Sequence, residues 1–514
     1  MTDRLSQSSD FASLDFVDVR SMQKETQLDL IVIGSGPAGQ KAAIFAAKAG
    51  ARVALVEREP MAGGVCLNTG TIPSKSLREA VMYLTGYRQR GYYGEKFRLK
   101  DKVSAGDLYD RTNHVITLER AAINEQLISN NVMSIIGRGV VRGPHEVGVV
   151  LGQQEFTYKA NRILIAVGTK TRRPSDLAFD DDNLFDSDRV FGRDNELRPL
   201  PDSMIVLGAG VIGIEYCTMF AALDVPTILV DPRPVPMGFI DSDIAEILYD
   251  SLRKSGCRLI FGQNYKKIDV LETAKGATGR VNVELDGGET ISADACLFAM
   301  GRTPATAELG LVEVGVVMDK RGYVIVDEKY RTSIPSIYAA GDVIGFPSLA
   351  STSAEQGRVA AADALGLPFT TNEESIPYGI YTIPEISMVG KTEEKLKEEN
   401  EGYFIGTALW RDTARGKILG DRTGAMKLIF ATSDNRLLGV HCIGEGATEI
   451  LHIGQAVMHF GGGVDYFLET VFNYPTLAEA YKIAAHNAVN RLHGRARHVA
   501  PLVEQVREAA FADT

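Results

Sequence analysis

The sequence predicts an α/β protein with two domains built on parallel sheets, followed by an α+β domain. The first observation is a pattern of strand, glycine-rich turn, helix and strand that occurs twice, at Gly34 and again at Gly208. The second is the length of 514 residues, which is too great for one hydrophobic core and predicts about two to four domains. The third is a change in the sequence pattern after about residue 373, where short β-rich runs precede helices.

The first copy of the pattern begins with a continuous apolar run, Leu30–Ile33, as expected of a buried parallel strand. Three glycines follow in the spacing G-x-G-x-x-G: Gly34, Gly36 and Gly39. An alanine-rich helix is expected up to Gly50, a natural C-cap. The next strand ends on Glu57, which is 57 − 34 = 23 residues after the first glycine.

This arrangement has a specific physical meaning. The first glycine permits a tight turn, the second lets the backbone approach a pyrophosphate, and the third lets helix and strand pack closely. The helix N-terminus then presents unpaired N–H groups to the phosphates. Glu57 is placed to accept the ribose hydroxyls. The unit is therefore predicted to be Rossmann-like and to bind a dinucleotide.

The second copy repeats each part. Its glycines are Gly208, Gly210 and Gly213, and its terminal acid is Asp231. The interval is again 231 − 208 = 23 residues. One isolated glycine triplet is weak evidence, but two copies with strand, helix and terminal acid predict two bound dinucleotides. A permanently held flavin and an exchanging nicotinamide nucleotide are the natural pair.

Composition and charge exclude several classes of protein. A net charge of −11 and a pI of about 5.4 argue against a nucleic-acid partner. The N-terminus has no apolar core typical of a secretory signal, and no run of about 20 apolar residues predicts a membrane span. The five cysteines have no metal-binding spacing and favour a reducing, cytoplasmic compartment without a metal site. They are Cys66, Cys217, Cys257, Cys296 and Cys442.

Four further motifs carry a family resemblance over about residues 28 to 490. They are GGVCLNTGTIPSK (63–75), IAVGTKTRRP (165–174), AMGRTPAT (299–306) and YAAGDV (338–343). With them the chain resembles the flavoprotein disulfide reductases, which contain dihydrolipoyl dehydrogenase and glutathione reductase. The resemblance implies tightly bound FAD, with NAD and NADP as substrates, and a homodimer or larger homo-oligomer.

The resemblance also implies roles for single residues. Lys75 would lie near the reactive nitrogen of the flavin and pair with Glu215 as the catalytic residues. Asp342 would accept from a ribityl hydroxyl. The expected cofactor-binding residues are Gly34, Gly36, Gly39, Glu57, Gly64, Cys66, Lys75, Gly168, Gly208, Gly210, Gly213, Asp231, Arg233, Gly301, Arg302 and Asp342.

The implied domains follow the same motifs. We expect a mobile N-terminal tail at 1–26, an FAD-binding domain at 27–172 and 303–372, an NAD(P)-binding domain at 173–302, a dimerisation domain at 373–495 and a C-terminal tail at 496–514. Residues after Arg491 are expected to be disordered or assembly-related. His441 and His452 are expected to be core or interface residues and not metal ligands.

The sequence departs from the disulfide reductases at two positions. Thr71 stands where relatives carry the second redox cysteine, five residues after Cys66. Tyr474 stands where they carry a histidine base before Pro475, although Glu479 remains. A hydroxyl cannot form a disulfide, and a phenol with an ordinary pKa of about 10 is a poor base at neutral pH.

These departures predict that thiol chemistry is lost while hydride chemistry remains. The combination of GTIPSK and NYPT is similar to the soluble (Si-specific) pyridine nucleotide transhydrogenases. The expected reaction is NADPH + NAD⁺ = NADP⁺ + NADH, in a ping-pong order through reduced flavin. Asp231 favours the ribose of NAD, and Arg233 either offsets its charge for NADP or is a solvated loop residue.

Several alternatives stay open. Cys66 is either an inert thiol or a thiolate that tunes the flavin. The chain could be a disulfide reductase that uses Cys66 with a distant thiol such as Cys442. It could be a diaphorase that passes electrons to oxygen or quinones. A protein of another class, a catalytically retired flavoprotein scaffold, is disfavoured by the intact Lys75, Glu215 and Asp342.

Overall fold

The chain folds into two units, each assembled from three segments. The computed structural model describes residues 27–94, 96–190, 199–271, 280–369, 375–494 and 500–511. Unit 1 comprises residues 1–76, 110–172 and 301–371, and unit 2 comprises residues 77–109, 173–300 and 372–514. The expected mobile tail at 1–26 lies outside the described residues, and the finer division into domains stays a prediction.

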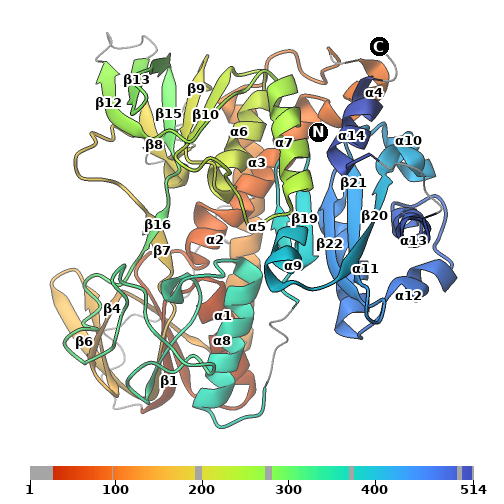
Figure 1. The fold of residues 1–514 in the computed structure, drawn as a ribbon. Helices are drawn as coiled ribbons and strands as arrows, with labels where there is room; N and C mark the ends of the chain where they lie inside the picture. Colours follow the sequence, from red (N-terminus) through yellow and green to blue (C-terminus); the bar gives the residue numbers. More distant parts are fainter. Residues whose placement is uncertain are drawn as a thin grey trace, which may run out of the picture. The chain divides into compact units, whose positions relative to one another are not determined.

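Unit 1 is built on a seven-stranded sheet in the order β3-β2-β1-β6-β5-β4, with β17 also paired to β6 (Figure 1). The strands are β1 (Leu28–Ile33), β2 (Val53–Glu57), β3 (Met133–Ile136), β4 (Arg138–Gly143), β5 (Glu146–Leu151), β6 (Gln154–Ile165) and β17 (Ile337–Ala339). β1 pairs in parallel with both β2 and β6, so the predicted apolar strand lies inside the sheet. Its burial on both faces explains its continuous apolar run.

Two helices of unit 1, α1 (Pro37–Lys48) and α8 (Ala350–Ala364), pack side by side (Figure 1). A glycine makes this closeness possible, because a Cβ on Gly357 would lie 2.2 Å from the carbonyl oxygen of Ala38. The other elements are α2 (Gly64–Asn68), the 3₁₀ helix η4 (Asp342–Ile344) and the antiparallel pair β7 (Thr169–Thr171) and β16 (Arg302–Pro304). The helices α3 (Thr71–Leu84) and α5 (Ala105–Ser129) each contribute residues to both units.

Unlike the sheet of unit 1, in which β4–β5 and β5–β6 pair antiparallel, the main sheet of unit 2 is parallel throughout, in the order β11-β10-β9-β15-β8. Its strands are β8 (Leu184–Asp186), β9 (Met204–Leu207), β10 (Thr227–Asp231), β11 (Arg258–Phe261) and β15 (Ala295–Phe298). The helices α6 (Val211–Ala222) and α7 (Ser242–Lys254) connect these strands. A separate three-stranded sheet holds β12 (Tyr265–Leu271), β13 (Arg280–Leu285) and β14 (Thr290–Ala293).

The C-terminal part of unit 2 is α+β. Its antiparallel sheet has the order β18-β19-β22-β21-β20. The strands are β18 (Tyr378–Ile380), β19 (Ile386–Gly390), β20 (Tyr403–Leu409), β21 (Ala425–Ala431) and β22 (Leu437–Ile443). The helices are α9 (Glu393–Glu399), α10 (Ala414–Leu419), α11 (Ala447–His459), α12 (Val464–Glu469) and α13 (Glu479–Leu492). The predicted β-rich runs and the helix beginning at Ala447 are confirmed.

Of the two alternatives expected for the C-terminus, disordered or assembly-related, the disordered one is wrong for residues 502–511. These residues form α14 (Leu502–Phe511), which packs against α7. Leu502 and Val506 are buried in the same apolar cluster as the inner face of α7. Arg507 pairs with Asp250 at 2.6 Å. Apolar residues at positions 502 and 506 lie on one face of a helix, and this spacing explains the docking.

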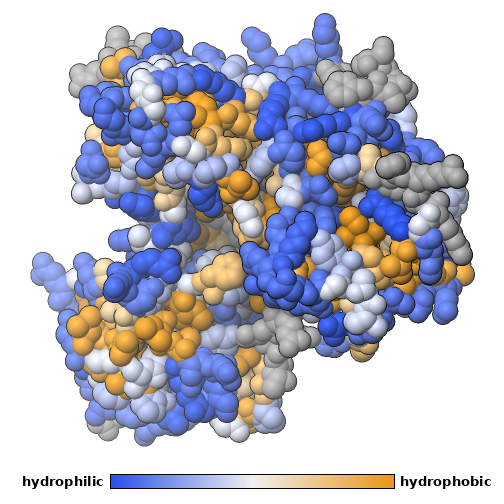
Figure 2. Space-filling view, viewed as in Figure 1, coloured by the Kyte–Doolittle hydropathy of each residue, from blue (hydrophilic) through white to orange (hydrophobic). Residues whose placement is uncertain are grey.

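The surface of the molecule agrees with its composition. Figure 2 shows that hydrophilic residues dominate the viewed face and that apolar residues gather in separate patches. Among the described residues, no helix is both long and apolar enough to cross a membrane.

A buried ion cluster joins three elements of unit 2. Lys427 on β21 is only 1% exposed and contacts Asp241, the N-cap of α7, at 2.8 Å. It also contacts Asp243 at 2.9 Å and Glu393 on α9. Burial alone would raise the pKa of Asp241, but His441 and Lys427 outweigh burial and hold this pKa below its ordinary value. The Asp241 carboxylate is therefore charged at neutral pH, and the cluster is stabilising only while it is complete.

We predict that Lys427→Ala destabilises unit 2 by about 3–5 kcal/mol, because three carboxylates lose their buried cation. The effect should appear as a lower thermal midpoint. Lys266→Ala is the matched control, since Lys266 is 65% exposed in its pair with Glu284, and it should leave the midpoint nearly unchanged. Equal midpoints for the two variants would contradict the stabilising role of the cluster.

Candidate functional site

The first glycine turn lies between β1 and α1. Gly34 has φ 103°, a left-handed conformation that favours glycine. A Cβ on Gly39 would lie 1.9 Å from the carbonyl oxygen of Gly34, so only glycine fits where the helix crosses the turn. A Cβ on Gly36, by contrast, would meet nothing within 4 Å. The second glycine therefore borders open space at the start of α1.

That open space suits a phosphate. Gly36 is the N-cap of α1 and Pro37 begins the helix, and no side chain caps the first turn. The backbone N–H groups there carry the positive end of the helix dipole. The predicted cradle for a pyrophosphate is therefore present in the residues themselves.

Glu57 lies at the end of β2, beside the turn, as its spacing predicts. Its Oε2 atom accepts hydrogen bonds from the N–H of Ser35 at 3.0 Å and from the hydroxyl of Ser35 at 2.7 Å. The Ser35 hydroxyl also accepts from the N–H of Gly63 at 3.0 Å. Ser35 thus ties the turn, the terminal acid and the GGVC loop together. Ser35 was not predicted, because the G-x-G-x-x-G pattern leaves this position unspecified.

The second turn, in unit 2, reproduces the first in detail. Gly208 has φ 100°, and a Cβ on Gly213 would lie 1.8 Å from the carbonyl oxygen of Gly208. Gly210 again has nothing within 4 Å of its Cβ position. Asp231 accepts from the N–H of Ala209 at 2.6 Å, as Glu57 accepts from Ser35. Each unit therefore holds one complete dinucleotide turn.

The two terminal acids differ in their surroundings. Arg233 lies two residues after Asp231 and forms a bidentate pair with its carboxylate. Nε donates to Oδ1 and Nη2 donates to Oδ2, each at 2.8 Å. Burial alone would raise the pKa of Asp231, but the side-chain and backbone hydrogen bonds of Arg233 outweigh burial and lower this pKa. Arg233 is therefore a partner of the acid, while its side chain remains 53% exposed in the loop after β10. Its role toward NADP stays a prediction.

Cys66 lies on α2, and Thr71 begins α3. Both residues lie within unit 1, five positions apart in the chain. Burial raises the pKa of the Cys66 thiol above its ordinary value, and Thr71 offsets only part of this effect. All five cysteines are free in the structure. The thiol form of Cys66, and not the thiolate, is therefore favoured at neutral pH.

Asp342 begins η4 in unit 1 and is half-buried. Its carboxylate contacts the hydroxyls of Thr169 and Ser353, each at 3.4 Å. Burial raises the pKa of Asp342, while nearby Arg302 lowers it in part. Both contacts are long for hydrogen bonds, so the carboxylate retains the capacity to accept from a further hydroxyl. A ribityl chain, as the resemblance implies, would satisfy this capacity.

Arg302 supports this group indirectly. Its Nε donates to the Thr169 hydroxyl at 2.8 Å and its Nη2 donates to the Thr169 carbonyl at 3.0 Å. Gln356, on α8, accepts from the N–H of Gly341 and fixes the approach to Asp342. Thr169, Ser353 and Gln356 were missed in the sequence. Thr169 could have been found from its place after Gly168, whereas the other two have no motif.

Three of the remaining predicted glycines surround these groups in unit 1. Gly168 accepts from the N–H of Ala305, and Gly301 accepts from the N–H of Arg172, so they close the two ends of the β7–β16 pair. A Cβ on Gly64 would lie 3.0 Å from the Cα of Gly36. Gly64 therefore lets α2 approach the first turn closely.

Lys75 and Glu215 belong to different units, Lys75 to unit 1 and Glu215 to unit 2. Their pairing stays a prediction. Within unit 2, Glu215 is buried on α6 and accepts from the N–H of Tyr381 at 2.8 Å. This bond fixes a carboxylate one turn after the second glycine turn. Tyr474, at the position of the lost histidine, has a side chain that is 70% exposed.

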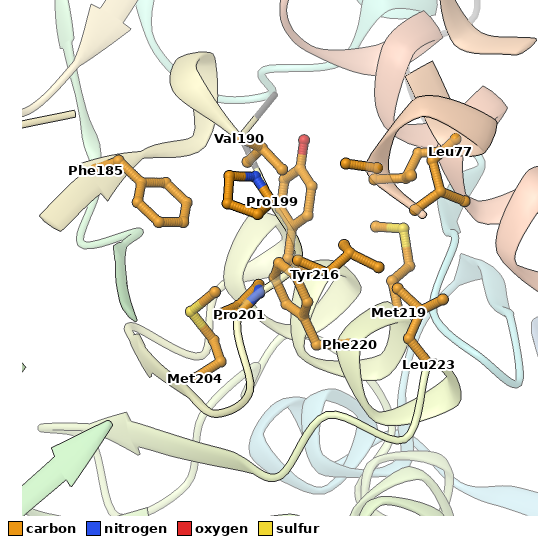
Figure 3. Close-up of a pocket in the computed structure, with 13 residues that line it drawn as sticks. Leu77, Phe185, Val190, Pro199, Pro201, Met204, Tyr216, Met219, Phe220 and Leu223 are labelled. Carbon is orange, nitrogen blue, oxygen red and sulfur yellow. The ribbon is translucent and has the colours of Figure 1, made fainter. Parts of the chain in front are cut away.

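A cavity of about 30 Å³ lies in unit 2, next to α6. Apolar and aromatic side chains line it, among them Phe185, Met204 and Tyr216 (Figure 3). It is far below the roughly 300–1,000 Å³ of a ligand pocket, and no glycine of the second turn lines it. This cavity is therefore a packing defect and not a nucleotide site.

The second turn generates a test with a matched pair of substitutions. Gly210→Ala adds a methyl group where no protein atom lies within 4 Å, so the thermal midpoint should not change. The methyl would obstruct the phosphate cradle and should raise the dissociation constant for NAD⁺ at least about tenfold, which corresponds to about 1.4 kcal/mol. Gly213→Ala should instead lower the midpoint, because its Cβ meets the Gly208 oxygen. Loss of stability in the first variant, or unchanged NAD⁺ binding, would contradict this assignment.

Comparisons with known proteins agree with this geometry. Residues 28–357 match the family described as pyridine nucleotide-disulphide oxidoreductase. Residues 376–485 match the dimerisation domain of that family. Among solved structures, the chain is similar to the HOCl-induced flavoprotein disulfide reductase RclA from Escherichia coli, with a TM-score of 0.78 and 26% identity. It is also similar to LpdA from Mycobacterium tuberculosis, with a TM-score of 0.81 and 27% identity. Each of the two matches covers 89% of this chain and 99% of the other.

Curated relatives narrow the family. A soluble pyridine nucleotide transhydrogenase from Mycobacterium bovis BCG is 46% identical over 468 residues, which cover 91% of this chain and 98% of the relative. The proteins of the same name from Chromohalobacter salexigens and Yersinia enterocolitica are 41% and 38% identical, over 90% and 92% of this chain and 98% and 100% of the relatives. The chain therefore belongs to the pyridine nucleotide-disulphide oxidoreductase family and, within it, to the soluble pyridine nucleotide transhydrogenases.

Proposed function

We propose that this protein exchanges hydride between NADPH and NAD⁺ in a ping-pong order, with bound FAD and without a redox-active disulfide. One observation carries the proposal: both dinucleotide turns are intact, while Thr71 stands where relatives need a second thiol and Cys66 is a free cysteine. The named relatives support the exchange of hydride between the two nucleotides.

The residues of unit 1 fit FAD. The first turn and α1 would hold its pyrophosphate, Glu57 its ribose, and Asp342 its ribityl hydroxyls. When bound, FAD supplies a group that accepts hydride from one nucleotide and returns it to another. The chain itself supplies the binding, the orientation and the charge around that group.

Lys75 and Glu215 have complementary tasks in this proposal. Lys75 places a fixed cation near the flavin ring, where negative charge develops. Glu215 is fixed by the N–H of Tyr381 and would orient the carboxamide of the nicotinamide. Neither task requires a thiol, so the absence of a second cysteine next to Cys66 does not interrupt the exchange.

The second turn would hold the nicotinamide nucleotides one after the other. Asp231 alone would repel the 2′-phosphate of NADP and favour the ribose of NAD. Because Arg233 forms a bidentate pair with Asp231, the local charge is balanced. When NADP is bound, the same arginine can turn to the 2′-phosphate. When NAD is bound, Asp231 can accept from the ribose hydroxyl. One site can thus admit both nucleotides.

Assembly is proposed from the C-terminal domain. Residues 376–485 match a dimerisation domain, and large apolar side chains are exposed on it, including Phe460 at 85% and Val471 at 90%. Exposed apolar groups of this size are typical of an interface. We propose a cytoplasmic homodimer in which these side chains are covered by a second copy.

The exchange can be measured with NADPH and thio-NAD⁺ in the absence of oxygen, because reduced thio-NAD has a distinct absorbance. We predict fast turnover with parallel lines in double-reciprocal plots, as in a ping-pong order. The Cys66→Ser variant should keep turnover within about threefold of the wild type, because no thiol takes part. Cys296→Ser, at a buried cysteine of β15, is the control for loss of a thiol elsewhere. A loss of turnover only in Cys66→Ser would contradict the proposal and favour a disulfide reductase.

Arg233→Ala should separate the two nucleotides. The KM for NADPH should rise about tenfold, because a charge-assisted contact to the 2′-phosphate is lost and Asp231 is left uncompensated. The KM for NADH should stay close to the wild-type value. Arg253→Ala, at an arginine on α7 with similar exposure, should change neither. An equal change in both KM values would show that Arg233 does not distinguish the nucleotides.

A further inference from the structure

Two cysteines that are distant in the sequence lie together in unit 2. The sulfur atoms of Cys217 and Cys257 are 3.9 Å apart, although 40 residues separate them in the chain. Cys217 lies on α6, two residues after Glu215, and Cys257 directly precedes β11. The hydride exchange proposed above uses neither of them. Within the described part of the chain, the other three cysteines have no comparable sulfur neighbour.

The geometry is close to that of a disulfide. Bonded sulfur atoms lie about 2.05 Å apart, so the present pair must approach by roughly 1.9 Å. Cys217 is inside a helix and cannot move far. Cys257 ends the three-residue connection 255–257 between α7 and β11. Gly256, in the middle of that connection, has nothing within 4 Å of its Cβ position, so the connection has room to shift.

We propose that Cys217 and Cys257 form a redox-sensitive dithiol, which a hydroperoxide converts into a disulfide that weakens nucleotide binding. The pair belongs to unit 2, whereas Cys66 belongs to unit 1, and it uses a different chemistry from hydride exchange. It needs no metal and no second copy of the chain.

The reaction balances in two steps. The Cys257 thiolate attacks one oxygen of the hydroperoxide, so that a sulfur–oxygen bond forms, the oxygen–oxygen bond breaks and an alcohol or water leaves. The Cys217 sulfur then attacks the sulfenic acid, the sulfur–sulfur bond forms, and water leaves with the Cys217 proton. Two thiols are oxidised by two electrons in total, and one hydroperoxide is reduced. A small thiol reverses the change by thiol–disulfide exchange.

The surroundings of the pair assign these roles. The Cys217 S–H donates to the Cys257 sulfur, and this contact raises the pKa of Cys217 and lowers that of Cys257. Cys257 is also the more accessible of the two, at 6% exposure against 0% for Cys217. Cys257 is therefore the attacking residue, and Cys217 is the resolving residue.

The consequence for the nucleotide follows from the position of β11. β11 pairs with β10 from Arg258 opposite Ile228 to Phe261 opposite Asp231. Gly262, directly after β11, donates to the carbonyl of Asp231 at 2.9 Å. A displacement of Cys257 toward α6 is therefore transmitted along β11 to the acid that faces the ribose. Nucleotide binding should weaken several-fold in the oxidised protein.

The linkage can be tested on the full chain with its bound flavin. We would treat the reduced protein with hydrogen peroxide and digest it without reductant for peptide mass spectrometry. The expected product is a peptide containing Cys217 joined to one containing Cys257, lighter by two hydrogens and separated by dithiothreitol. In the denatured protein, the count of free thiols should fall from five to 5 − 2 = 3. If Cys257 were found as a sulfinic acid, or if both thiols remained free, the proposal would be overturned.

Variants separate this pair from the other thiols. Cys257→Ala should abolish the joined peptide, whereas Cys296→Ala, which removes another buried thiol of the same sheet, should preserve it. The wild-type measurement alone decides the linkage if a variant does not fold. For the second part, NADP⁺ binding is compared before and after oxidation in wild type and in Cys257→Ala. A several-fold weaker binding only in the wild type is expected, and an unchanged dissociation constant would overturn the effect on nucleotide binding.

Discussion

In each nucleotide turn, the third glycine lies in the helix against the carbonyl oxygen of the first glycine, and this contact fixes the direction of the helix. The helix that follows the turn crosses the carbonyl of the first glycine so closely that no Cβ fits on the third, in unit 1 at Gly39 and in unit 2 at Gly213. This contact directs the N-terminus of α1 or α6 into open space, where a phosphate can accept its N–H groups. The terminal acid, the Ser35 bridge and the Asp342 group are all arranged around that point.

The two turns show how one framework can serve two ligands. In unit 1, Glu57 is held by a serine and by backbone N–H groups, which suits one ligand that stays bound. In unit 2, Asp231 forms a bidentate pair with Arg233, whose long side chain can turn away from the carboxylate. A fixed acid selects one ribose, whereas an acid with a movable cation can admit a ribose or a phosphate. The difference therefore lies at the two acids and not in the glycines.

Local sequence patterns predicted the parts of this protein that depend on local geometry. The glycine spacing and the apolar runs were enough for β1, α1, β9, α6 and both terminal acids, because each lies within about 25 residues of its partner along the chain. Ser353 and Gln356 could not be found, because they reach Asp342 and the N–H of Gly341, respectively, from a helix without a motif. The Cys217–Cys257 contact and the docking of α14 on α7 depend on tertiary packing. The expectation of disorder at residues 502–511 was therefore wrong, while the assembly-related alternative stays a prediction.

Counting the electrons that the protein accepts tests hydride exchange without a redox-active disulfide most directly. The Cys257→Ala variant would be titrated with dithionite in the absence of oxygen, so that the dithiol of unit 2 cannot contribute. We predict that the titration ends after one electron pair per bound flavin, because Thr71 gives Cys66 no partner for a disulfide. An uptake of two electron pairs per flavin would show that Cys66 forms a disulfide with another cysteine, and it would contradict this account.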